Sequence, residues 1–317
     1  MKQDAGASAT KPGAIAIVCT VRTDEATLTR WIAYHRHCGV DRFLLFFDYA
    51  DDPVIERFER DECVTITRWD AAHWARATTL PANPALDERQ IFNTACALTA
   101  ARRDGIEWLL HIDTDELLYV PGHDLRRYLA RNGRSADAMT FQTLEAMPKA
   151  ACQRHVFEEI RWFKRSRSPI RGAGLAARLL GCGTLFRHGL VKGHAIGKSI
   201  VRVAADVGII GVHKPFATPG HSLPTIVARD AYLLHFDCCT YDDWALKWQR
   251  RGDGTAAVAQ MRDERKAQLA EFMATSGDLK RRRALYDQLM ASPWQYVVLA
   301  LLRFTRCVPL PSHMFQP

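Results

Sequence analysis

The feature that most constrains this chain is an apolar run that ends in a cluster of acidic residues. Residues 108–118 read WLLHIDTDELL, so a stretch with the composition of a buried strand leads directly into Asp113, Asp115 and Glu116. Burying three uncompensated carboxylates would cost too much free energy for a stable fold. Ligands of open parallel sheets bind outside the carboxyl ends of strands, so the run predicts a binding site at this point. If the strand continues through the cluster, Asp113 and Asp115 point the same way.

Short apolar runs alternate with helical patterns along the first half of the chain. Runs of this kind are typical of strands that are buried on both faces of a parallel sheet. The order therefore predicts an α/β fold with a mostly parallel sheet flanked by crossover helices. The expected strands are 14–20, 43–47, 64–68 and 108–112, with later ones at 138–144, 199–203, 207–212 and 232–236; the expected helices are 24–35, 54–60, 86–103 and 240–251.

Composition along the chain predicts three parts. Residues 1–13 are small and polar and end in Lys-Pro-Gly, which favours a disordered N-terminus. Residues 14–240 form the α/β domain. Residues 241–317 are mostly helical by pattern and are expected to form a C-terminal extension.

The charge of the chain narrows its partners. The formal net charge is +8 and the isoelectric point is about 9.1, which favours nucleic acid, an anionic membrane surface or a phosphate-bearing ligand. No aromatic and glycine alternation resembles an RNA-recognition signature, so nucleic acid is not expected. The nine cysteines form no CxxC pair, and neither a secretory signal nor a membrane-spanning run is recognisable, so a cytoplasmic location is expected.

The acidic cluster suits a divalent cation. Carboxylate oxygens are hard donors that bind Mg²⁺ or Mn²⁺, which in turn bridge phosphate oxygens. A second acidic segment, residues 48–52, ends an earlier expected strand, and two acidic strand ends in one sheet suggest one shared site. The alternative is that the Asp-rich turns only cap the elements that follow them.

Several motifs together resemble a known family. They are Val21-Arg-Thr-Asp-Glu25 after the first strand, a helix with Leu28, Trp31 and His35, a Gly39-Val-Asp41 turn, Asp48 at a strand end, and residues 108–116. In this order they resemble the glycosyltransferase family two group of the GT-A type and the related family 92 enzymes. The resemblance covers about the first 120 residues and returns at 197–215 and 234–252. It departs at Arg22-Thr23, where Lys-Asn is usual, and at 161–166, where Phe-Gly-Ser is usual.

The resemblance implies a fold, an activity and a set of site residues. It implies a GT-A domain that transfers a sugar from a nucleotide-sugar donor, expected to be UDP-linked, to a glycan or lipid-linked acceptor with inversion, using Mn²⁺ or Mg²⁺. Asp113 would face the ribose and the metal, Asp115 would be the main metal carboxylate, and His213 would be a further metal ligand. Lys198 would neutralise the diphosphate. The residues implied at the nucleotide are Thr20, Val21, Arg22, Glu25 and Asp48.

The roles of two further cationic residues and the identity of the catalytic base follow less directly from the sequence. Lys247 and Arg251 are candidates for phosphate contacts, although a charged helix face is often only solvated. The base candidates are Asp237 and His235, with Glu145 as a third. The alternative is that His235 packs in the core and Asp237 caps the helix that follows.

The C-terminal stretch 293–304 is apolar and lies near arginines, so it is a candidate for peripheral contact with the inner face of a membrane. A helix that closes the core or forms a dimer face is the alternative. Two rival functions also remain open at this point. One is a nucleotidyl- or phosphotransferase with the same acidic metal site, and the other is a non-catalytic basic module that binds glycan.

Overall fold

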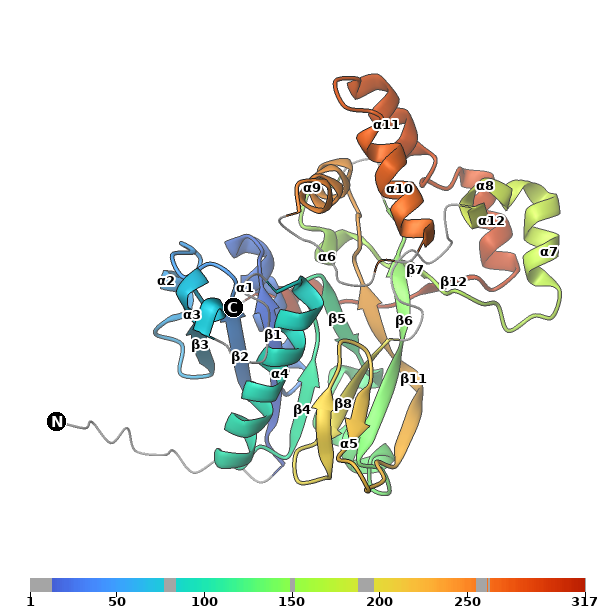
Figure 1. The fold of residues 1–317 in the computed structure, drawn as a ribbon. Coiled ribbons are helices and arrows are strands. Elements are labelled where there is room, and N and C mark those ends of the chain that lie inside the picture. The colour runs from blue at the N-terminus through green and yellow to red at the C-terminus, as the bar shows by residue number, and fades with distance from the viewer. Residues whose placement is uncertain are drawn as a thin grey trace.

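The structure is a computed structural model that describes residues 13–76, 84–148, 152–187, 197–254, 261 and 263–316. Its centre is a ten-stranded sheet with the order β12-β7-β6-β8-β4-β1-β2-β3, and β11 pairs with both β5 and β6 (Figure 1). The strands are β1 (Ile15–Val21), β2 (Arg42–Phe47), β3 (Val64–Arg68), β4 (Trp108–His111), β5 (Glu116–Tyr119), β6 (Ala138–Ala146), β7 (Trp162–Lys164), β8 (Lys198–Arg202), β11 (Thr225–His235) and β12 (Thr305–Cys307). A separate hairpin is formed by β9 (Val207–Ile210) and β10 (Pro215–Ala217).

Strand β1 is buried on both faces, as its unbroken apolar sequence predicts. Ile15, Ile17 and Cys19 pack in the same cluster as Leu28 and Trp31 of α1 (Glu25–His37). The alternate side chains, including those of Ala16 and Val18, pack against α4 (Leu86–Arg103) on the other face. Because successive side chains of a strand point to opposite faces, a helix on each side explains why β1 carries no polar face.

The parallel part of the sheet runs β4-β1-β2-β3, and all three of its pairings are parallel. Helix α1 connects β1 to β2 and begins at Asp24, whose carboxylate accepts a hydrogen bond from the backbone N–H of Thr27 at 2.9 Å. Helix α4 precedes β4 and has the bounds that the apolar periodicity predicts. Each of these helices therefore lies between two parallel strands in the chain, as crossover connections require.

The two aspartates of the acidic cluster do not lie on a strand. Strand β4 ends at His111, and Asp113 and Asp115 occupy the turn before β5, which begins at Glu116. The chain then reverses and β5 pairs antiparallel with β11. The strand therefore does not continue through both aspartates, and the turn rather than a shared strand face sets their directions.

The second half of the sheet is mixed. β8 is antiparallel to both β4 and β6, and β11 is parallel to β6. This confirms the predicted α/β fold with a mostly parallel sheet flanked by helices, to which antiparallel strands are added. The shorter helices around the sheet are α2 (Ile55–Phe58), α3 (Ala71–Arg76), η1 (Pro121–His123), α5 (Leu125–Asn132) and α6 (Val156–Glu159).

Helices also gather at one end of the sheet, above the strand ends in Figure 1. Helices α9 (Tyr241–Gly252), α10 (Asp263–Met273) and α11 (Leu279–Asp287) pack through Trp244, Trp248, Phe272 and Tyr286. A second group beside them contains α7 (Ala173–Ala177), η2 (Arg178–Cys182), α8 (Gly183–Arg187) and α12 (Pro293–Leu301).

The C-terminal segment also returns to the sheet, which the helical pattern did not predict. β12 pairs antiparallel with β7, and η3 (Ser312–Phe315) packs on α1, where the Phe315 ring stacks on Tyr34 with 5.4 Å between centroids. The described part of the chain contains no helix long and apolar enough to cross a membrane. The predicted disordered segment 1–13 lies outside the described residues except for Gly13.

Candidate active site

The acidic turn is held in place by a buried tryptophan of α1. The indole Nε1 of Trp31 donates to the backbone oxygens of Asp113 at 3.1 Å and of Glu116 at 2.8 Å. The carboxylate of Glu116 in turn accepts from the backbone N–H of Asp113 at 2.9 Å. On the far side, the N–H of Phe236 donates to the backbone oxygen of Asp115 at 2.8 Å. The backbone of the turn is thus fixed by two elements that are distant in sequence.

Asp113 lies in a buried polar cluster with Lys198 and Glu116. The ammonium of Lys198 is 3.0 Å from Oδ2 of Asp113 and 3.6 Å from Oε2 of Glu116, and its side chain is only 2% exposed. Gln90 of α4 donates to Oδ1 of Asp113 at 2.7 Å. A lysine can stay charged at this depth because two carboxylates face it.

The charges in this cluster determine each other's protonation. Burial would lower the pKa of Lys198, but Asp113 and Glu116 raise it well above the usual value. Burial would raise the pKa of Asp113, but Lys198 holds it well below the usual range. For Glu116 burial is the larger effect and raises its pKa to about 7. Asp113 and Lys198 therefore form the persistent ion pair of the site.

A second cluster lies directly beside it and joins the acidic turn to the end of β11. The cluster consists of Asp115, His235 and Asp237. Each of these side chains offers one ligand atom, and the three atoms lie within 4.8 Å of one another, so the group could hold a metal ion. Nε2 of His235 is 3.5 Å from Oδ2 of Asp115. The register of β11 on β5 places His235 opposite Glu116 and so explains this approach.

Cations from α9 and α10 close the second cluster. Lys247 of α9 lies 2.5 Å from Asp237 and 3.6 Å from Asp115, and Arg265 of α10 lies 3.6 Å from Asp237. Burial would lower the pKa of His235, but Asp115 raises it to about 9. Burial would raise the pKa of Asp237, but Lys247 and His235 hold it well below its usual range. In this arrangement the carboxylates are ionised and His235 carries a proton.

The ends of β1 and β2 form a third polar region on the same edge of the sheet. The hydroxyl of Thr20 accepts from Nδ2 of Asn93 at 2.9 Å. Asp48 follows β2 and forms a two-pronged ion pair with Arg89 of α4, at 3.0 and 2.8 Å. The backbone N–H of Asp48 donates to the oxygen of Val21 at 3.4 Å. Helix α4, which carries Gln90 as well, therefore connects this region to Asp113.

The sequence of this chain matches a known protein family. The model of glycosyltransferase family 92 matches residues 17–271, which is more than half of the chain. The chain belongs to glycosyltransferase family 92. The family 92 match contains the second part of β1, the acidic turn, β11 and α9, so all three polar regions lie inside it.

Curated relatives agree with this family 92 assignment. Glycosyltransferase-like At3g57200 of Arabidopsis thaliana is 29% identical over 171 residues, which are 47% of this chain and 33% of that protein. Glycosyltransferase-like At2g41451 of the same plant is 28% identical over 178 residues, 49% of this chain and 40% of that protein. Glycosyltransferase family 92 protein RCOM_0530710 of Ricinus communis is 24% identical over 240 residues, 74% of this chain and 36% of that protein. The chain thus aligns with at most 40% of the length of these relatives.

Some residues implied by the sequence resemblance lie elsewhere in the family 92 domain. His213 is not a member of the group formed by Asp115, His235 and Asp237. Its Nδ1 lies 3.2 Å from the backbone oxygen of Gly197. Glu25 lies in the first turn of α1, where its exposed carboxylate is 3.7 Å from Arg57.

Arg22 and Glu145 take up their own positions near the strand ends. The guanidinium of Arg22 lies over the ring of Tyr49, 5.0 Å from its centroid. Glu145, the third candidate for the base, is 1% exposed on β6, in register with His235 on one side and Lys164 of β7 on the other.

The sequence analysis did not single out Gln90 and Arg265 of the first two polar clusters, nor Arg89 and Asn93 of the third polar region. Gln90 contacts Asp113, and Arg265 contacts Asp237. A signal for Gln90 exists in the sequence, because Gln90, Asn93 and Thr94 place polar side chains on one face of an otherwise amphipathic helix, and all three are buried. Arg265 has no comparable signal, because residues 263–273 are rich in charged side chains and their pattern indicates an exposed helix.

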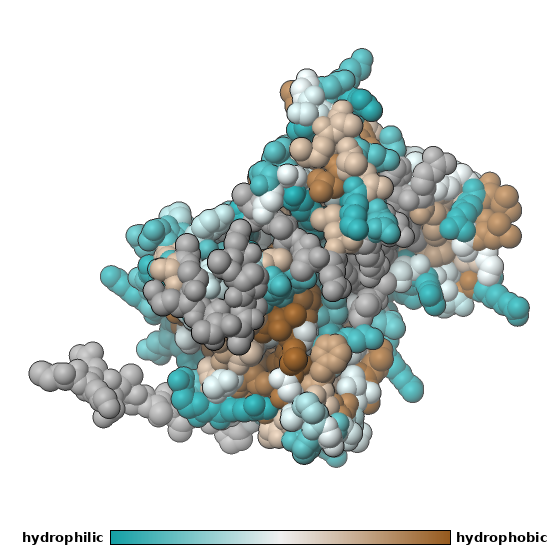
Figure 2. All heavy atoms as spheres, in the orientation of Figure 1, coloured by the Kyte–Doolittle hydropathy of each residue, from teal (hydrophilic) through white to brown (hydrophobic). Residues whose placement is uncertain are grey.

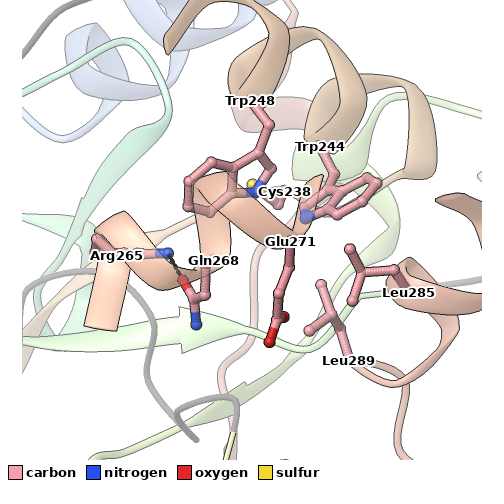
Figure 3. A pocket seen from close by; sticks show the side chains of 8 residues that line it. All are labelled: Cys238, Trp244, Trp248, Arg265, Gln268, Glu271, Leu285 and Leu289. Carbon is pink, nitrogen blue, oxygen red and sulfur yellow. Dashed lines mark hydrogen bonds between the residues drawn. The ribbon is translucent and has the colours of Figure 1, made fainter. Parts of the chain in front are cut away.

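A pocket adjoins the second cluster on the side of the C-terminal helices. Figure 3 shows Trp244 and Trp248 of α9 on one side and Leu285 and Leu289 on the other, with Cys238 at the base. Polar side chains of α10 complete the lining, namely Arg265, Gln268 and Glu271. Cys238 follows Asp237 in the chain and Arg265 contacts Asp237, so the pocket lies next to the second cluster.

Proposed function

We propose that this chain transfers a sugar from a nucleotide-sugar donor, with Mn²⁺ or Mg²⁺ held by Asp115, His235 and Asp237. The observation that carries the proposal is the approach of ligand atoms from these three side chains to within 4.8 Å of one another. The group lies at strand ends of the central sheet, the usual place for a ligand in an open α/β fold. Membership of glycosyltransferase family 92 supports the same reaction class.

The residues present fit a divalent cation. Two carboxylates and an imidazole suit Mn²⁺, whereas Mg²⁺ prefers oxygen donors throughout, so Mn²⁺ is the better match. The side chain of Asp115 keeps 39% of its surface exposed, which leaves an approach for the ion and for phosphate oxygens. A cation bound here would take over the charge balance that Lys247 and the proton on His235 provide.

The nucleoside belongs on the other side of the acidic turn in this proposal. Thr20, the backbone of Val21 and Asp48 line the ends of β1 and β2, and α4 connects them to Asp113. Oxygen atoms at these positions suit hydrogen bonds from a uracil base and a ribose. The donor is therefore proposed to be UDP-linked, with its diphosphate reaching from Asp113 toward Asp115.

The leaving group must be stabilised as it gains negative charge. Lys198 and Lys247 place ammonium groups on the two sides of the turn, at 3.0 Å from Asp113 and 3.6 Å from Asp115. A bound divalent cation would supply Lewis-acid stabilisation of the same charge. Fixed cations in a largely buried site act strongly because little water screens them.

Asp237 is the proposed base for the acceptor hydroxyl, through the carboxylate oxygen that does not face the cation. Its carboxylate is ionised, whereas His235 carries a proton in this arrangement and would lose that proton on binding the metal. Lys247 and Arg265 orient the carboxylate while they weaken its basicity. A carboxylate that takes the proton during direct attack implies inversion at the anomeric carbon, which proton NMR of the product measures.

The acceptor, a glycan or a lipid-linked glycan, is proposed to approach Asp237 across the open side of Asp115, whose side chain keeps 39% of its surface exposed. The pocket of Figure 3 is too small to hold a sugar ring, because Trp244 and Trp248, which line it, are almost fully buried.

The decisive experiment is calorimetry with UDP, with and without Mn²⁺, on four forms of the chain. We expect Mn²⁺ to strengthen UDP binding to the unchanged chain. In Asp115→Asn and His235→Gln, the affinity for UDP in the presence of Mn²⁺ should be at least about tenfold lower. Asp206→Asn is the control, because Asp206 is an exposed carboxylate 2.9 Å from a histidine on the β9–β10 side of the fold. Hydrolysis of UDP-sugars, measured on the same proteins, should fall in parallel.

Two results would contradict the proposal. If Asp115→Asn leaves Mn²⁺-dependent UDP binding unchanged, the metal does not bind at this group. If nucleoside triphosphates bind and react while UDP-sugars do not, the acidic site serves nucleotidyl transfer.

A further inference from the structure

The helices α7, η2, α8 and α12 form a small lobe at the side of the sheet, called the α7–α12 lobe below (Figure 1). It has its own core, in which Ala177, Cys182 and Leu185 pack with Val298 and Leu299. Its two halves are fastened by Gln295, which donates to the backbone oxygen of Gly181 at 2.8 Å. The lobe is therefore an ordered unit whose outer face has a fixed shape.

The outer face of this lobe is unusually apolar for a surface. Exposed fractions are high for large apolar side chains of α7, η2 and α12, namely Leu175 (65%), Leu179 (78%), Leu180 (46%), Trp294 (59%), Val297 (47%) and Leu301 (73%). The indole Nε1 of Trp294 donates to the backbone oxygen of Leu180 at 3.3 Å, which links the α12 and η2 parts of the face. Figure 2 shows hydrophobic side chains at the outer edge of the molecule over this lobe. Apolar surfaces of this kind mark interaction sites.

The two segments that contain the lobe, together with strands β7 and β12 of the central sheet, carry all the excess positive charge of the chain. Residues 160–187 contain seven arginines and lysines, residues 291–316 contain two more, and neither segment contains an aspartate or glutamate. These nine positive charges exceed the formal net charge of the whole chain, +8, so the rest of the protein is close to neutral. Arg167, Arg171, Arg178 and Arg303 are among the exposed ones.

We infer that the α7–α12 lobe binds the surface of an anionic lipid bilayer. Apolar side chains that enter the boundary of the acyl chains, with arginines around them that meet acidic headgroups, provide the two signals that stable peripheral binding requires. The longest of these helices, α12, has nine residues, so the lobe would lie in the interface and not span it. The inference stands on the lobe alone and does not depend on the proposed metal site.

Other occupants fit the same face less well. Nucleic acid would match the charge, but six exposed apolar side chains would gain nothing against phosphates and would remain in water. A second copy of the chain would cover the apolar groups, but it would bring two arginine-rich segments without acidic partners together. An anionic bilayer satisfies both the charge and the apolar surface.

Vesicle flotation of the 317-residue chain tests the inference. We expect binding to vesicles of phosphatidylcholine with phosphatidylglycerol, weak binding to phosphatidylcholine alone, and partial loss of binding in high salt. The double variant Leu179→Asp with Leu301→Asp should bind at least about tenfold more weakly, because two inserting side chains are replaced by charges. Leu279→Asp is the matched control, because Leu279 on α11 is exposed by 73%, as Leu301 is, but lies outside the lobe.

A second pair of variants tests the charge. Arg171→Glu should weaken binding to the anionic vesicles more than Lys280→Glu does, although both side chains are exposed, because only Arg171 lies next to the lobe, two residues before α7. Circular dichroism melts establish that the variants remain folded.

Three outcomes would overturn the inference. One is binding to anionic vesicles that does not exceed binding to phosphatidylcholine, or that the lobe variants do not reduce. Another is equally strong binding to single-stranded RNA that ignores the leucine changes. The third is a stable dimer, measured by light scattering, that the double variant dissociates.

Discussion

The ammonium of Lys198 lies 3.0 Å from the carboxylate of Asp113, with only 2% of the lysine side chain exposed. A lysine in this position is held in the fold by the charges that face it, and those charges depend equally on the lysine. The ion pair thus links the stability of the fold to the acidic turn that the proposed function requires.

Replacing this lysine should destabilise the protein. Lys198→Met leaves Asp113 and Glu116 without their cation, so we expect the free energy of unfolding to fall by about 3 kcal/mol. Lys266→Met is the control, since Lys266 also lies 3.0 Å from a carboxylate, that of Asp263, but is 63% exposed and should change stability by less than ~1 kcal/mol. Urea unfolding measures both. Equal losses would show that burial of the pair is not what matters.

The tryptophan that closes the acidic turn should affect both stability and nucleotide binding. Trp31→Phe keeps an aromatic side chain, but it removes the two hydrogen bonds to Asp113 and Glu116 and leaves a cavity at this buried position, at a cost of about 2 kcal/mol or more. Because the freed turn carries Asp115, Mn²⁺-dependent binding of UDP should weaken as well. Trp294→Phe, which changes an exposed indole, should leave UDP binding unaltered. A stability loss without any change in binding would mean that Asp115 does not need the fixed turn.

The glycine before Lys198 is required by the close approach of β6. Gly197 has φ +79°, and a Cβ there would lie 1.7 Å from the backbone oxygen of Phe141. Gly197→Ala should therefore cost about 3 kcal/mol or more and displace Lys198. Gly277→Ala is the control. Gly277 has φ +80°, but no atom lies within 4 Å of the new Cβ, so only the backbone cost of about 1–2 kcal/mol is expected. Thermal melts that show the same loss for both would remove the steric explanation.

His35 should make stability depend on pH. Its Nδ1 lies 2.8 Å from the oxygen of Trp31, and its Nε2 accepts from the N–H of Leu118 at 3.2 Å, so the folded protein holds a neutral ring. Burial lowers the pKa of His35 from 6.5 to about 3. Below pH 6.5 the unfolded chain takes up a proton that the folded chain does not, so this stabilisation is complete above pH 6.5 and is lost as the pH falls toward 3.

The size of this effect can be measured by unfolding at several pH values. At pH 5 the contribution of His35 to the free energy of unfolding is lower than at pH 7.5 by about 2 kcal/mol. His35→Gln should reduce the slope of stability against pH in this range without removing it, because burial also lowers the pKa of His111 to about 3. An unchanged slope in the variant would contradict the assignment.

Much of the fold could be predicted because its signals are local. The unbroken apolar sequence of β1, the Asp24 cap of α1 and the periodicity of α4 each specify an element from its own residues. For these three elements the expected ends differ from the observed ones by at most two residues, whereas β11 begins at Thr225 and not at the expected residue 232. β12 was not expected, because a three-residue strand has no periodicity of its own and forms only where β7 offers an open edge.

The candidate site shows the same division. The position of Asp113 and Asp115 after a buried strand followed from the sequence. Whether the strand continues through them did not, because the Trp31 indole that shapes the turn comes from a distant helix. The sequence also proposed His235 and Asp237, but as bases beside a metal site that included His213. The grouping of Asp115 with His235 depends on the register of β11 on β5, and no local pattern encodes that register.

By itself, the sequence determined which segments become strands and helices and that carboxylates gather at a strand end, because hydrophobic periodicity and helix caps act over a few residues. Only the tertiary structure decided which of the charged groups meet. Asp115, His235 and Lys247 come together because long-range pairing of β11 and packing of α9 bring distant segments to one edge. The free energy of those contacts depends on burial and on partners, which are properties of the folded chain and not of any short stretch of it.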